Sequence, residues 1–374
     1  MRVAVPWRVY ELRARSLPLR GPRAWALSVV ALVLALALGL VVLALTGVDP
    51  LGAYGAMLDA TVLGGWPGIA DTLTQATPLV LTGLGCALAF RAGLWNVGAE
   101  GQLLVGAWAA TGVASVWVGP GHGRLVTLGL MTLAGFAAGA LWGAVPGVLR
   151  AHARTNEILS SLMLTYVAVQ WNNYWIYSPW SDRGFQMTPV FPRSAWMPTV
   201  ADFLGGGSAL RGSQLHLGLV FALVLVVGVW LLVSRTRLGY ELGLLGANPD
   251  TAHYAGVPVA RRIVQVLALS GGLAGLAGML EVSGVVHRLQ EHFSPGYGFS
   301  GILVAWLARL HPAGVVVAAL LFAVLLVGAK QVQPSGVATM LQGVVLLALI
   351  ACEVLYRYRV VRRDAAALPG GGPP

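Results

Sequence analysis

Residues 93–102 of the chain read GLWNVGAEGQ, a glycine-rich polar segment between two uncharged apolar runs. Its side chains Asn96, Glu100 and Gln102 can all form hydrogen bonds. In one interpretation Asn96 caps the following helix and Glu100 lies in its first turn, where the helix dipole stabilises a negative charge. In the other, the glycines interrupt a helix at membrane depth and the three polar side chains line a solute path. The two interpretations are compatible.

The composition of the chain is that of a membrane protein. Of its 374 residues, 57% are hydrophobic and only 10% are charged, and the mean hydropathy is +0.75. These values argue strongly against a soluble domain. A helix needs about 20 apolar residues to cross a bilayer, and uncharged runs of that order recur along the whole chain. We therefore predict an all-α membrane protein rather than a β-barrel.

Ten apolar runs are candidates for transmembrane helices. Nine are long enough to cross a bilayer, and the glycines 296, 298 and 301 around the start of the tenth suggest a half-helix, a re-entrant segment or part of a broken helix. The nine longer runs are residues 24–46, 73–90, 103–118, 125–149, 158–177, 215–233, 263–280, 314–329 and 337–352, and the short run is residues 299–308. We predict a polytopic protein with about ten transmembrane helices.

The basic residues predict the orientation. They lie between the apolar runs and not on one face, which argues against nucleic-acid binding despite a net charge of +10. With ten crossings and a cytoplasmic N-terminus, 18 of the 24 lysines and arginines lie inside, in agreement with the positive-inside rule. Residues 1–23 then form a basic cytoplasmic N-terminus, residues 24–356 the transmembrane domain and residues 357–374 a disordered cytoplasmic tail. Of the two long connections, residues 178–214 lie outside and residues 234–262 lie in the cytoplasm.

The long cytoplasmic connection contains a helix start. Asn248 is a favourable N-cap, Pro249 suits the first helical position, and the helix dipole favours Asp250 in the first turn. The short helix should run towards Tyr254 and end near Gly256. Such a helix between two membrane spans is a natural docking site for another protein.

Two sets of glycines predict close helix packing. Glycines at every fourth position give a helix a smooth face that a neighbouring helix can approach closely. The first set is Gly135, Gly139, Gly143 and Gly147, and the second is Gly271, Gly275 and the nearby Gly278. We assign both sets to helix contacts and not to chemistry.

Amides and aromatic rings alternate near the end of the run at 158–177. An interfacial aromatic belt explains the rings without a ligand, whereas stacking rings and hydrogen-bonding amides would also suit a nucleobase. Trp171 and Asn172 are therefore candidates for an outer vestibule.

At the start of the same run, Asn156 and Glu157 are expected to cap the helix. The acidic and histidine residues between 281 and 292 do not have the spacing of a zinc site, so we expect no metal.

The chain lacks an energy source of its own. A phosphate-binding P-loop needs the pattern GxxxxGK[ST], but the only lysine, Lys330, lies in the sequence AKQ. If ATP and its magnesium drive this protein, another subunit must bind them. No nucleophile constellation is evident either, so we do not expect an enzyme.

Several stretches resemble one family of membrane proteins. RAGLWNVGAEGQ at 91–102 resembles the RAGLFNIGAEGQ signature of permease subunits of bacterial ABC importers in the branched-chain amino acid, simple sugar and nucleoside group. Three further segments agree in order: TNEILSSLMLTY at 155–166, LGANPDTAHYAGVPVARR at 245–262 followed by SGGLAGLAGMLEVSG at 270–284, and GYGFSGILVAWLARLHP at 296–312. The resemblance extends over about residues 50–357 and is strongest to the longer permease of nucleoside importers.

The resemblance implies an importer in the bacterial cytoplasmic membrane. It implies a substrate-binding lipoprotein outside, a second homologous permease as partner, and ATPase subunits that bind ATP and magnesium inside. The residues that it implies for ATPase coupling are Gly246, Asn248, Pro249, Asp250, Tyr254 and Gly256, and our candidates for the solute path are Asn96, Glu100, Gln102, Trp171 and Asn172.

Three departures from the family pattern put the solute in question. Ser300 replaces an acidic residue, Thr165 replaces a common asparagine, and ARLHP at 308–312 stands where GRNNP is frequent. Nucleosides are the expected solutes, and simple sugars or branched-chain amino acids are the alternatives. An ion-coupled secondary transporter with Glu100 as its titrating group, or a structural scaffold without a polar path, would belong to a different class.

Overall fold

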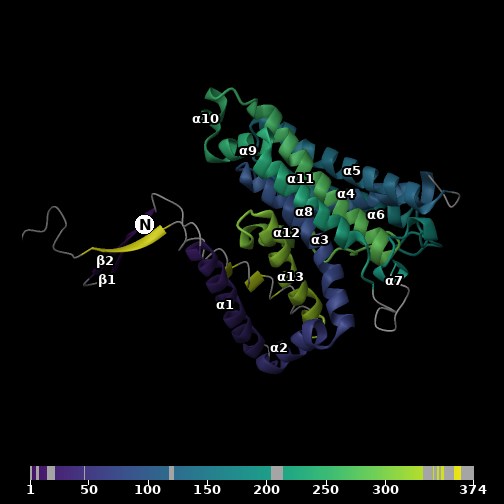
Figure 1. The fold of residues 1–374 in the computed structure, drawn as a ribbon, viewed down its shortest axis with the longest axis horizontal. Helices are drawn as coiled ribbons and strands as arrows, with labels where there is room; N and C mark the ends of the chain where they lie inside the picture. Colours follow the sequence, from purple (N-terminus) through teal and green to yellow (C-terminus); the bar gives the residue numbers. More distant parts are fainter. Residues whose placement is uncertain are drawn as a thin grey trace, which may run out of the picture. The chain divides into compact units, whose positions relative to one another are not determined.

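The computed structural model describes residues 2–5, 8–14, 22–45, 47–117, 122–203, 214–331, 340, 343–344, 347–348 and 358–363 (Figure 1). Most of the predicted run at 337–352 therefore lies outside the described residues. The chain divides into two compact units, one of Met1–Ala53 with Gln333–Pro374 and one of Tyr54–Val332.

The first unit contains a long apolar helix and a small sheet. Helix α1 spans Pro22–Leu45, as the first apolar run predicts, and α2 (Pro50–Leu58) begins in this unit. The sheet has the antiparallel order β1-β2-β3, with β1 at Arg2–Val5, β2 at Arg8–Ala14 and β3 at Tyr358–Arg363.

The sheet departs from the all-α expectation. Val9 of β2 pairs with Arg363 of β3, and Ala14 pairs with Tyr358, so part of the tail expected to be disordered is a strand. Valine and tyrosine, which recur in both segments, favour strands. The pairing partner lies at the opposite end of the sequence, so that no local pattern points to it.

The second unit is a bundle of helices. In chain order these are η1 (Asp59–Leu63), α3 (Trp66–Arg91), α4 (Ala99–Gly112), η2 (Val113–Trp117), α5 (Arg124–Ala153), α6 (Glu157–Tyr177), η3 (Arg193–Ala195), α7 (Val200–Phe203), α8 (Gly218–Arg235), α9 (Arg237–Ala247), α10 (Pro249–Tyr254), α11 (Val259–Glu281), η4 (Val282–Val286), α12 (Tyr297–Leu307) and α13 (Pro312–Ala329). Figure 1 shows α9 and α10 at one end of the long helices and α7 at the other.

Five helices in the described part of the second unit are long and apolar enough to cross a membrane. They are α3, α5, α8, α11 with η4, and α13, and they contain the predicted runs at 73–90, 125–149, 263–280 and 314–329 and most of the run at 215–233. Helix α6 has 21 residues but is too polar to join this group. The total of ten crossings and the side of each terminus stay predictions.

Helix α11 packs against α3, α4 and α5 in the middle of the bundle. The two predicted glycine faces meet each other here: a Cβ atom at Gly139 would overlap the carbonyl oxygen of Gly271, and one at Gly275 would overlap that of Gly135. The predicted close packing is confirmed, and α5 and α11 approach so closely that their backbones touch. Larger side chains at these positions would force the helices apart.

Helix α12 is the short tenth segment. Its 11 residues are too few to cross a bilayer alone. Gly296, with φ of +90°, turns the chain into the helix, and a Cβ atom at Gly298 would overlap the backbone nitrogen of Glu100. The structure confirms that this segment is short, and the glycines allow the start of α12 to lie directly against α4.

Candidate functional site

The segment at 93–102 holds three helices together through an amide pair. The Nδ2 group of Asn96 donates to Gln102 Oε1 and to Ser270 Oγ, both at 2.7 Å, and Gln102 Nε2 donates back to Asn96 Oδ1 at 2.9 Å. Ser270 Oγ in turn donates to the carbonyl oxygen of Gly85 at 2.7 Å. These residues are buried and join α3, α4 and α11.

The predicted N-cap role of Asn96 is wrong. Helix α4 begins at Ala99 with Gly98 as its N-cap, and no side chain caps it. The Asn96 side chain is instead used by Gln102 and Ser270. Neither Asn96 nor Gln102 lines the two pockets described below, and their predicted place on a solute path stays a prediction.

Glu100 connects α4 to the start of α12. It lies in the first turn of α4, as predicted, and is buried. Its Oε2 atom accepts a hydrogen bond of 2.6 Å from the backbone nitrogen of Gly298. Because the first backbone N–H groups of a helix lack partners within that helix, this carboxylate satisfies one such group of α12 and stabilises its positive end.

A pocket of about 330 Å³ lies beside Glu100. We name it the α4–α6 pocket, since it is formed by α4, α6, the start of α12 and the segment before α12. Its lining residues are Glu100, Leu104, Thr165, Tyr166, Val169, Asn172, Asn173, Gln290, Glu291, His292, Phe293, Ser294, Gly296 and Phe299. The lining thus combines carboxylates, amides and aromatic rings, and includes two of the five predicted path residues.

Asn172 lines this pocket and has an unpaired, buried oxygen. The residue is only 5% exposed, and its Nδ2 group donates to the carbonyl oxygen of Ala168 at 3.1 Å. Its buried Oδ1 atom has no hydrogen-bond partner in the part of the chain that the structure describes. Buried polar atoms nearly always have a partner, so an unpaired acceptor on a residue that lines a pocket is a candidate for contact with a bound solute or water.

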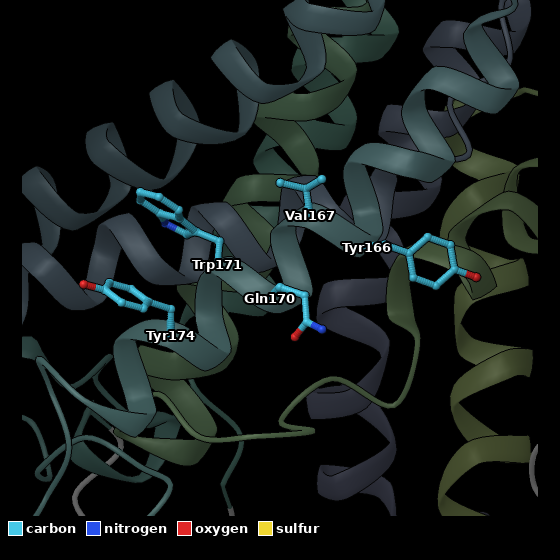
Figure 2. Close-up of a pocket in the computed structure, with 5 residues that line it drawn as sticks. All are labelled: Tyr166, Val167, Gln170, Trp171 and Tyr174. Carbon is cyan, nitrogen blue, oxygen red and sulfur yellow. The ribbon is translucent and has the colours of Figure 1, made fainter.

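Trp171 has different surroundings, although it is the next residue along α6. Figure 2 shows it with Tyr166, Val167, Gln170 and Tyr174, which line an open hollow on the surface of this helix. Its ring contacts those of Trp108 and Trp175, with centroid distances of 5.3 and 5.9 Å. The structure therefore places Trp171 in an aromatic cluster and not in the lining of the α4–α6 pocket.

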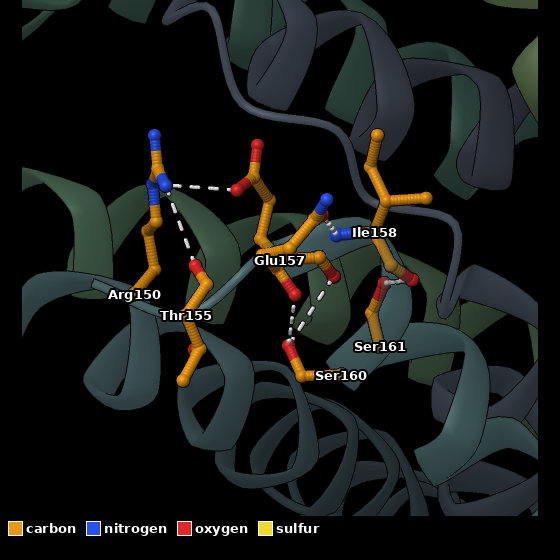
Figure 3. A network of polar contacts seen from close by, with 7 residues as sticks. Arg150, Thr155, Glu157, Ile158, Ser160 and Ser161 are labelled. Atoms are coloured by element: carbon orange, nitrogen blue, oxygen red, sulfur yellow. Dashed lines mark hydrogen bonds and ion pairs between the residues drawn. The ribbon is translucent and has the colours of Figure 1, made fainter. Parts of the chain in front are cut away.

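The start of α6 is stabilised by local polar contacts (Figure 3). The Oδ1 atom of Asn156 accepts from the backbone nitrogen of Ile158 at 2.9 Å, which confirms the predicted cap. Glu157, in the first turn, forms an ion pair of 3.3 Å with Arg150 of α5. The side chains of Asn156 and Glu157 therefore have partners within the protein, and stabilisation of the helix start explains both residues.

Helix α10 begins and ends as predicted. The Oδ1 atom of Asn248 accepts from the backbone nitrogens of Asp250 at 2.9 Å and Thr251 at 3.2 Å, and Pro249 occupies the first position. The chain leaves the helix at Gly256, whose φ of +76° favours glycine. Tyr254, at the end of the helix, is 89% exposed.

Gly246 places the end of α9 against the polar segment at 91–102. A Cβ atom at Gly246, near the end of α9, would overlap the carbonyl oxygen of Arg91, and one at Gly93 would lie 3.3 Å from the Cα atom of Gly246. Two segments more than 140 positions apart in the sequence therefore touch through their backbones. Side chains at these glycines would separate them.

A second polar contact lies at the start of α12, and no sequence pattern predicts it. The hydroxyl of Tyr297 donates to Gln75 Oε1 at 2.5 Å and to Glu281 Oε1 at 3.5 Å. The three residues come from separate helices, and nothing in their local sequence distinguishes them. In the described ranges no three histidine, cysteine, aspartate or glutamate residues form a group that could hold a metal ion.

Comparison with known proteins identifies the family. The family described as the permease component of the branched-chain amino acid transport system matches residues 68–350. The chain is 38% identical to a glucose ABC transporter permease of Haloferax volcanii over 90% of both chains, and 35% identical to a guanosine ABC transporter permease of Bacillus subtilis over 80% of this chain and 84% of the relative.

A nucleoside ABC transporter permease of Lactococcus lactis is 31% identical over 86% of this chain and 88% of its own. A second guanosine permease of B. subtilis and a second nucleoside permease of L. lactis also match. No solved structure matches the chain. The chain therefore belongs to the family of branched-chain amino acid transport system permease components, and is a multi-pass membrane permease of an ABC transporter.

Proposed function

We propose that this permease carries nucleosides into the cell, driven by ATP that is hydrolysed on separate ATPase subunits. The chain crosses the cytoplasmic membrane about ten times, with both termini inside, and opens its path alternately to each side. The observation that carries the proposal is the α4–α6 pocket, where a buried amide oxygen of Asn172 has no partner in the described residues. A solute with a hydrogen-bond donor would supply that partner.

The lining of the pocket suits a nucleoside in shape and chemistry. A volume of about 330 Å³ is at the lower end for small-molecule sites. Asn172, Asn173 and Gln290 offer amides for the polar edge of a base or for ribose hydroxyls, and Phe293 and Phe299 offer rings for stacking.

The charges of the lining disfavour solutes with a carboxylate. Glu100 and Glu291 both line the pocket, and the lining contains no arginine or lysine. Glu291 lies 3.5 Å from His292, whose positive charge depends on protonation. A branched-chain amino acid would bring its carboxylate close to these acids without a permanent cation to pair with it. Neutral solutes such as nucleosides and sugars avoid this repulsion.

A simple sugar is the second candidate. The similarity to the glucose permease over nearly the full length favours it, and the amides would bind sugar hydroxyls as well as a base. A sugar would, however, make no use of the stacking surface of Phe293 and Phe299. Competition between unlabelled glucose and a labelled nucleoside for uptake distinguishes the two solutes.

The partners follow from the same proposal. A second permease completes the path, as the paired guanosine and nucleoside permeases support. A lipoprotein delivers the solute outside, and ATPase subunits with ATP and magnesium dock inside. Asn248, Pro249 and Asp250 build the helix that docks, and the exposed Tyr254 and the turn at Gly256 lie at its end.

The test is uptake of radiolabelled nucleosides by cells that express the chain with its ATPase, second permease and binding protein. The matched control carries an ATPase subunit disabled at its P-loop. We expect uptake that disappears in the control. Uptake that persists in the control and collapses with the proton gradient would contradict the proposal in favour of an ion-coupled transporter, and uptake of sugars alone would change the solute.

A further inference from the structure

Helix α9 carries a buried carboxylate that binds two arginines. Glu241 is only 3% exposed. Its Oε1 atom accepts from Nε of Arg237 at 2.7 Å, and its Oε2 atom accepts from Nε of Arg262 at 2.5 Å. Arg237 lies on the same helix, whereas Arg262 lies in the first turn of α11. Glu241 therefore connects α9 to the start of α11.

The two ion pairs differ in burial. The side chain of Arg237 is 85% exposed and that of Arg262 only 17%. Arg262 is also fixed on its far side, since its Nη1 group donates to Gln265 Oε1 at 2.6 Å. An exposed pair within one helix contributes little, whereas loss of one partner from a buried pair leaves an unpaired charge. The connection to α11 thus depends mainly on Glu241 and Arg262.

The same helix also contacts the segment that leads to the α4–α6 pocket. Gly246 lies against the backbone of Arg91 and Gly93. From there the chain continues to Asn96, whose side-chain amide donates a hydrogen bond to Ser270 of α11. It then reaches Glu100, which lines the pocket. Helix α9 is therefore joined by two routes to α4, which lines the pocket: one through α11, which packs against α4, and one through the connection between α3 and α4.

Helix α10 follows α9 without a spacer. Asn248 ends α9, its backbone nitrogen donating to the carbonyl oxygen of Leu244, and its side chain caps α10. A displacement of α10 is consequently transferred to α9. Beyond Arg262, the close glycine contact between α11 and α5 leaves little room for the two helices to move independently.

We propose that Glu241 is a positioning residue which, through Arg262, transmits the movement of α10 to α11 and hence to the α4–α6 pocket. This inference rests on the proposed ATP-driven function, since it assumes that an ATPase moves α10. Glu241 contacts neither solute nor ATP. Its role is to keep the docking segment and the central helix of the bundle moving together.

The test measures nucleoside uptake and ATP hydrolysis together. The complete transporter is reconstituted in proteoliposomes, and the number of nucleosides transported per ATP hydrolysed is determined. For Glu241→Ala we expect this ratio to fall about tenfold, while the rate of ATP hydrolysis changes less than twofold. A tenfold change lies within the range by which single mutations alter the coupling between two sites of a protein. The matched control Arg237→Ala removes only the exposed pair and should keep the ratio within about twofold of the wild type.

A charge exchange separates transmission from a merely structural role. In the Arg237→Ala background, Glu241→Arg combined with Arg262→Glu restores an ion pair between α9 and α11 with reversed charges. We expect the exchange to recover the transport ratio to within about threefold of the Arg237→Ala control, because it restores the pair itself. This variant also decides the question if Glu241→Ala fails to assemble with its partners.

The outcomes separate this inference from the proposed function. A normal ratio in assembled Glu241→Ala, or a ratio that stays low in the assembled charge exchange, would overturn the inference while leaving the proposed function in place. Absence of ATP-dependent uptake by the wild-type transporter would overturn the proposed function and the inference with it.

Discussion

Two sets of buried amides look alike in the sequence and differ in the structure. Asn96 and Gln102 bond to each other and to Ser270, and they join three helices. Asn172 is also buried, yet its Oδ1 atom has no partner among the described residues and the side chain lines a pocket. The comparison teaches that a polar side chain in an apolar bundle is a better candidate for solute contact when the protein leaves part of it unpaired.

Glu100 belongs to both regions. Like the amide pair, it has a defined partner in another helix, the backbone nitrogen of Gly298. Like Asn172, it lines the α4–α6 pocket. Through Glu100 the segment at 91–102 reaches the pocket, although Asn96 and Gln102 do not line it.

The largest effect is expected from breaking the amide pair. Asn96→Ala would leave the buried amide of Gln102 without its reciprocal partner, at a cost of about 1–3 kcal/mol in the free energy of unfolding. Thermal unfolding of the purified protein in detergent measures this loss. We expect a lower midpoint and a lower yield of folded protein, since the pair joins α3, α4 and α11.

A double-mutant cycle checks the cause. If reciprocal bonding stabilises the pair, Asn96→Ala with Gln102→Ala should cost less than the sum of the two single changes, by about 0.5–2 kcal/mol. Strict additivity would contradict this account. It would indicate that each side chain stabilises the protein independently of the other.

The second effect is expected in transport more than in stability. Asn172→Ala removes the unpaired oxygen and should raise the Km for nucleoside uptake about tenfold, equivalent to about 1.4 kcal/mol of lost binding free energy. The midpoint of unfolding should fall less than for Asn96→Ala, because the only hydrogen bond that the described side chain loses is the one from Nδ2 to the carbonyl oxygen of Ala168. Gln170→Ala, on the hollow beside Trp171, is the matched control and should leave Km within about twofold.

The reverse pattern would break the comparison between the two regions. If Asn172→Ala destabilised the protein as much as Asn96→Ala and left Km unchanged, the asparagine of α6 would be a structural residue. The α4–α6 pocket would then lose its main argument for solute contact.

Much of the fold could be predicted because apolar runs and helix caps are local features. The runs at 125–149 and 263–280 predict α5 and α11, and their glycine spacing predicts the close approach of these helices. Asn248 and Pro249 predict the start of α10 to the residue. Each of these features depends on residues within a few turns of the chain, so one sequence is enough to recognise them.

The details of the site could not be predicted in the same way. Ser270, a partner of Asn96, is 174 positions away, and Gly298, a partner of Glu100, is 198 positions away. The sequence identifies these side chains as polar groups in an apolar setting but does not say whether they bond to protein or face a pocket. For the same reason the sequence leaves both a capping role and a place on a solute path open for Asn96, and it groups Trp171 with Asn172 although they have different surroundings.

A smaller effect is expected from neutralising Glu100. Glu100→Gln keeps an oxygen that can accept from Gly298 but removes the charge at the positive end of α12, which should lower the free energy of unfolding by about 0.3–1 kcal/mol. Thermal unfolding measures this change, and ATP-dependent nucleoside uptake should continue. Complete loss of uptake with normal folding would instead favour the titrating role that an ion-coupled transporter requires.

The smallest effect is expected when the pH is changed and the stability that Glu241 contributes is measured. Like the amides of Asn96 and Gln102, this carboxylate has hydrogen-bond partners within the protein, Arg237 and Arg262. The hydrogen bond from Arg262 is the main cause that lowers the pKa of this carboxyl below its ordinary value of 4.5. A carboxyl whose pKa is lowered on folding contributes stability that is fully present above the unfolded pKa and is lost as the pH falls through the folded pKa.

The difference in unfolding midpoint between the wild type and Glu241→Gln should therefore be constant from about pH 8 to pH 5.5 and should shrink only in more acidic solution. Thermal unfolding of both proteins across this pH series measures it, with Arg237→Ala as the control for the exposed ion pair. A difference that already disappeared near pH 7 would mean that Glu241 is protonated under physiological conditions, and the ionic connection between α9 and α11 would then be absent when the transporter works.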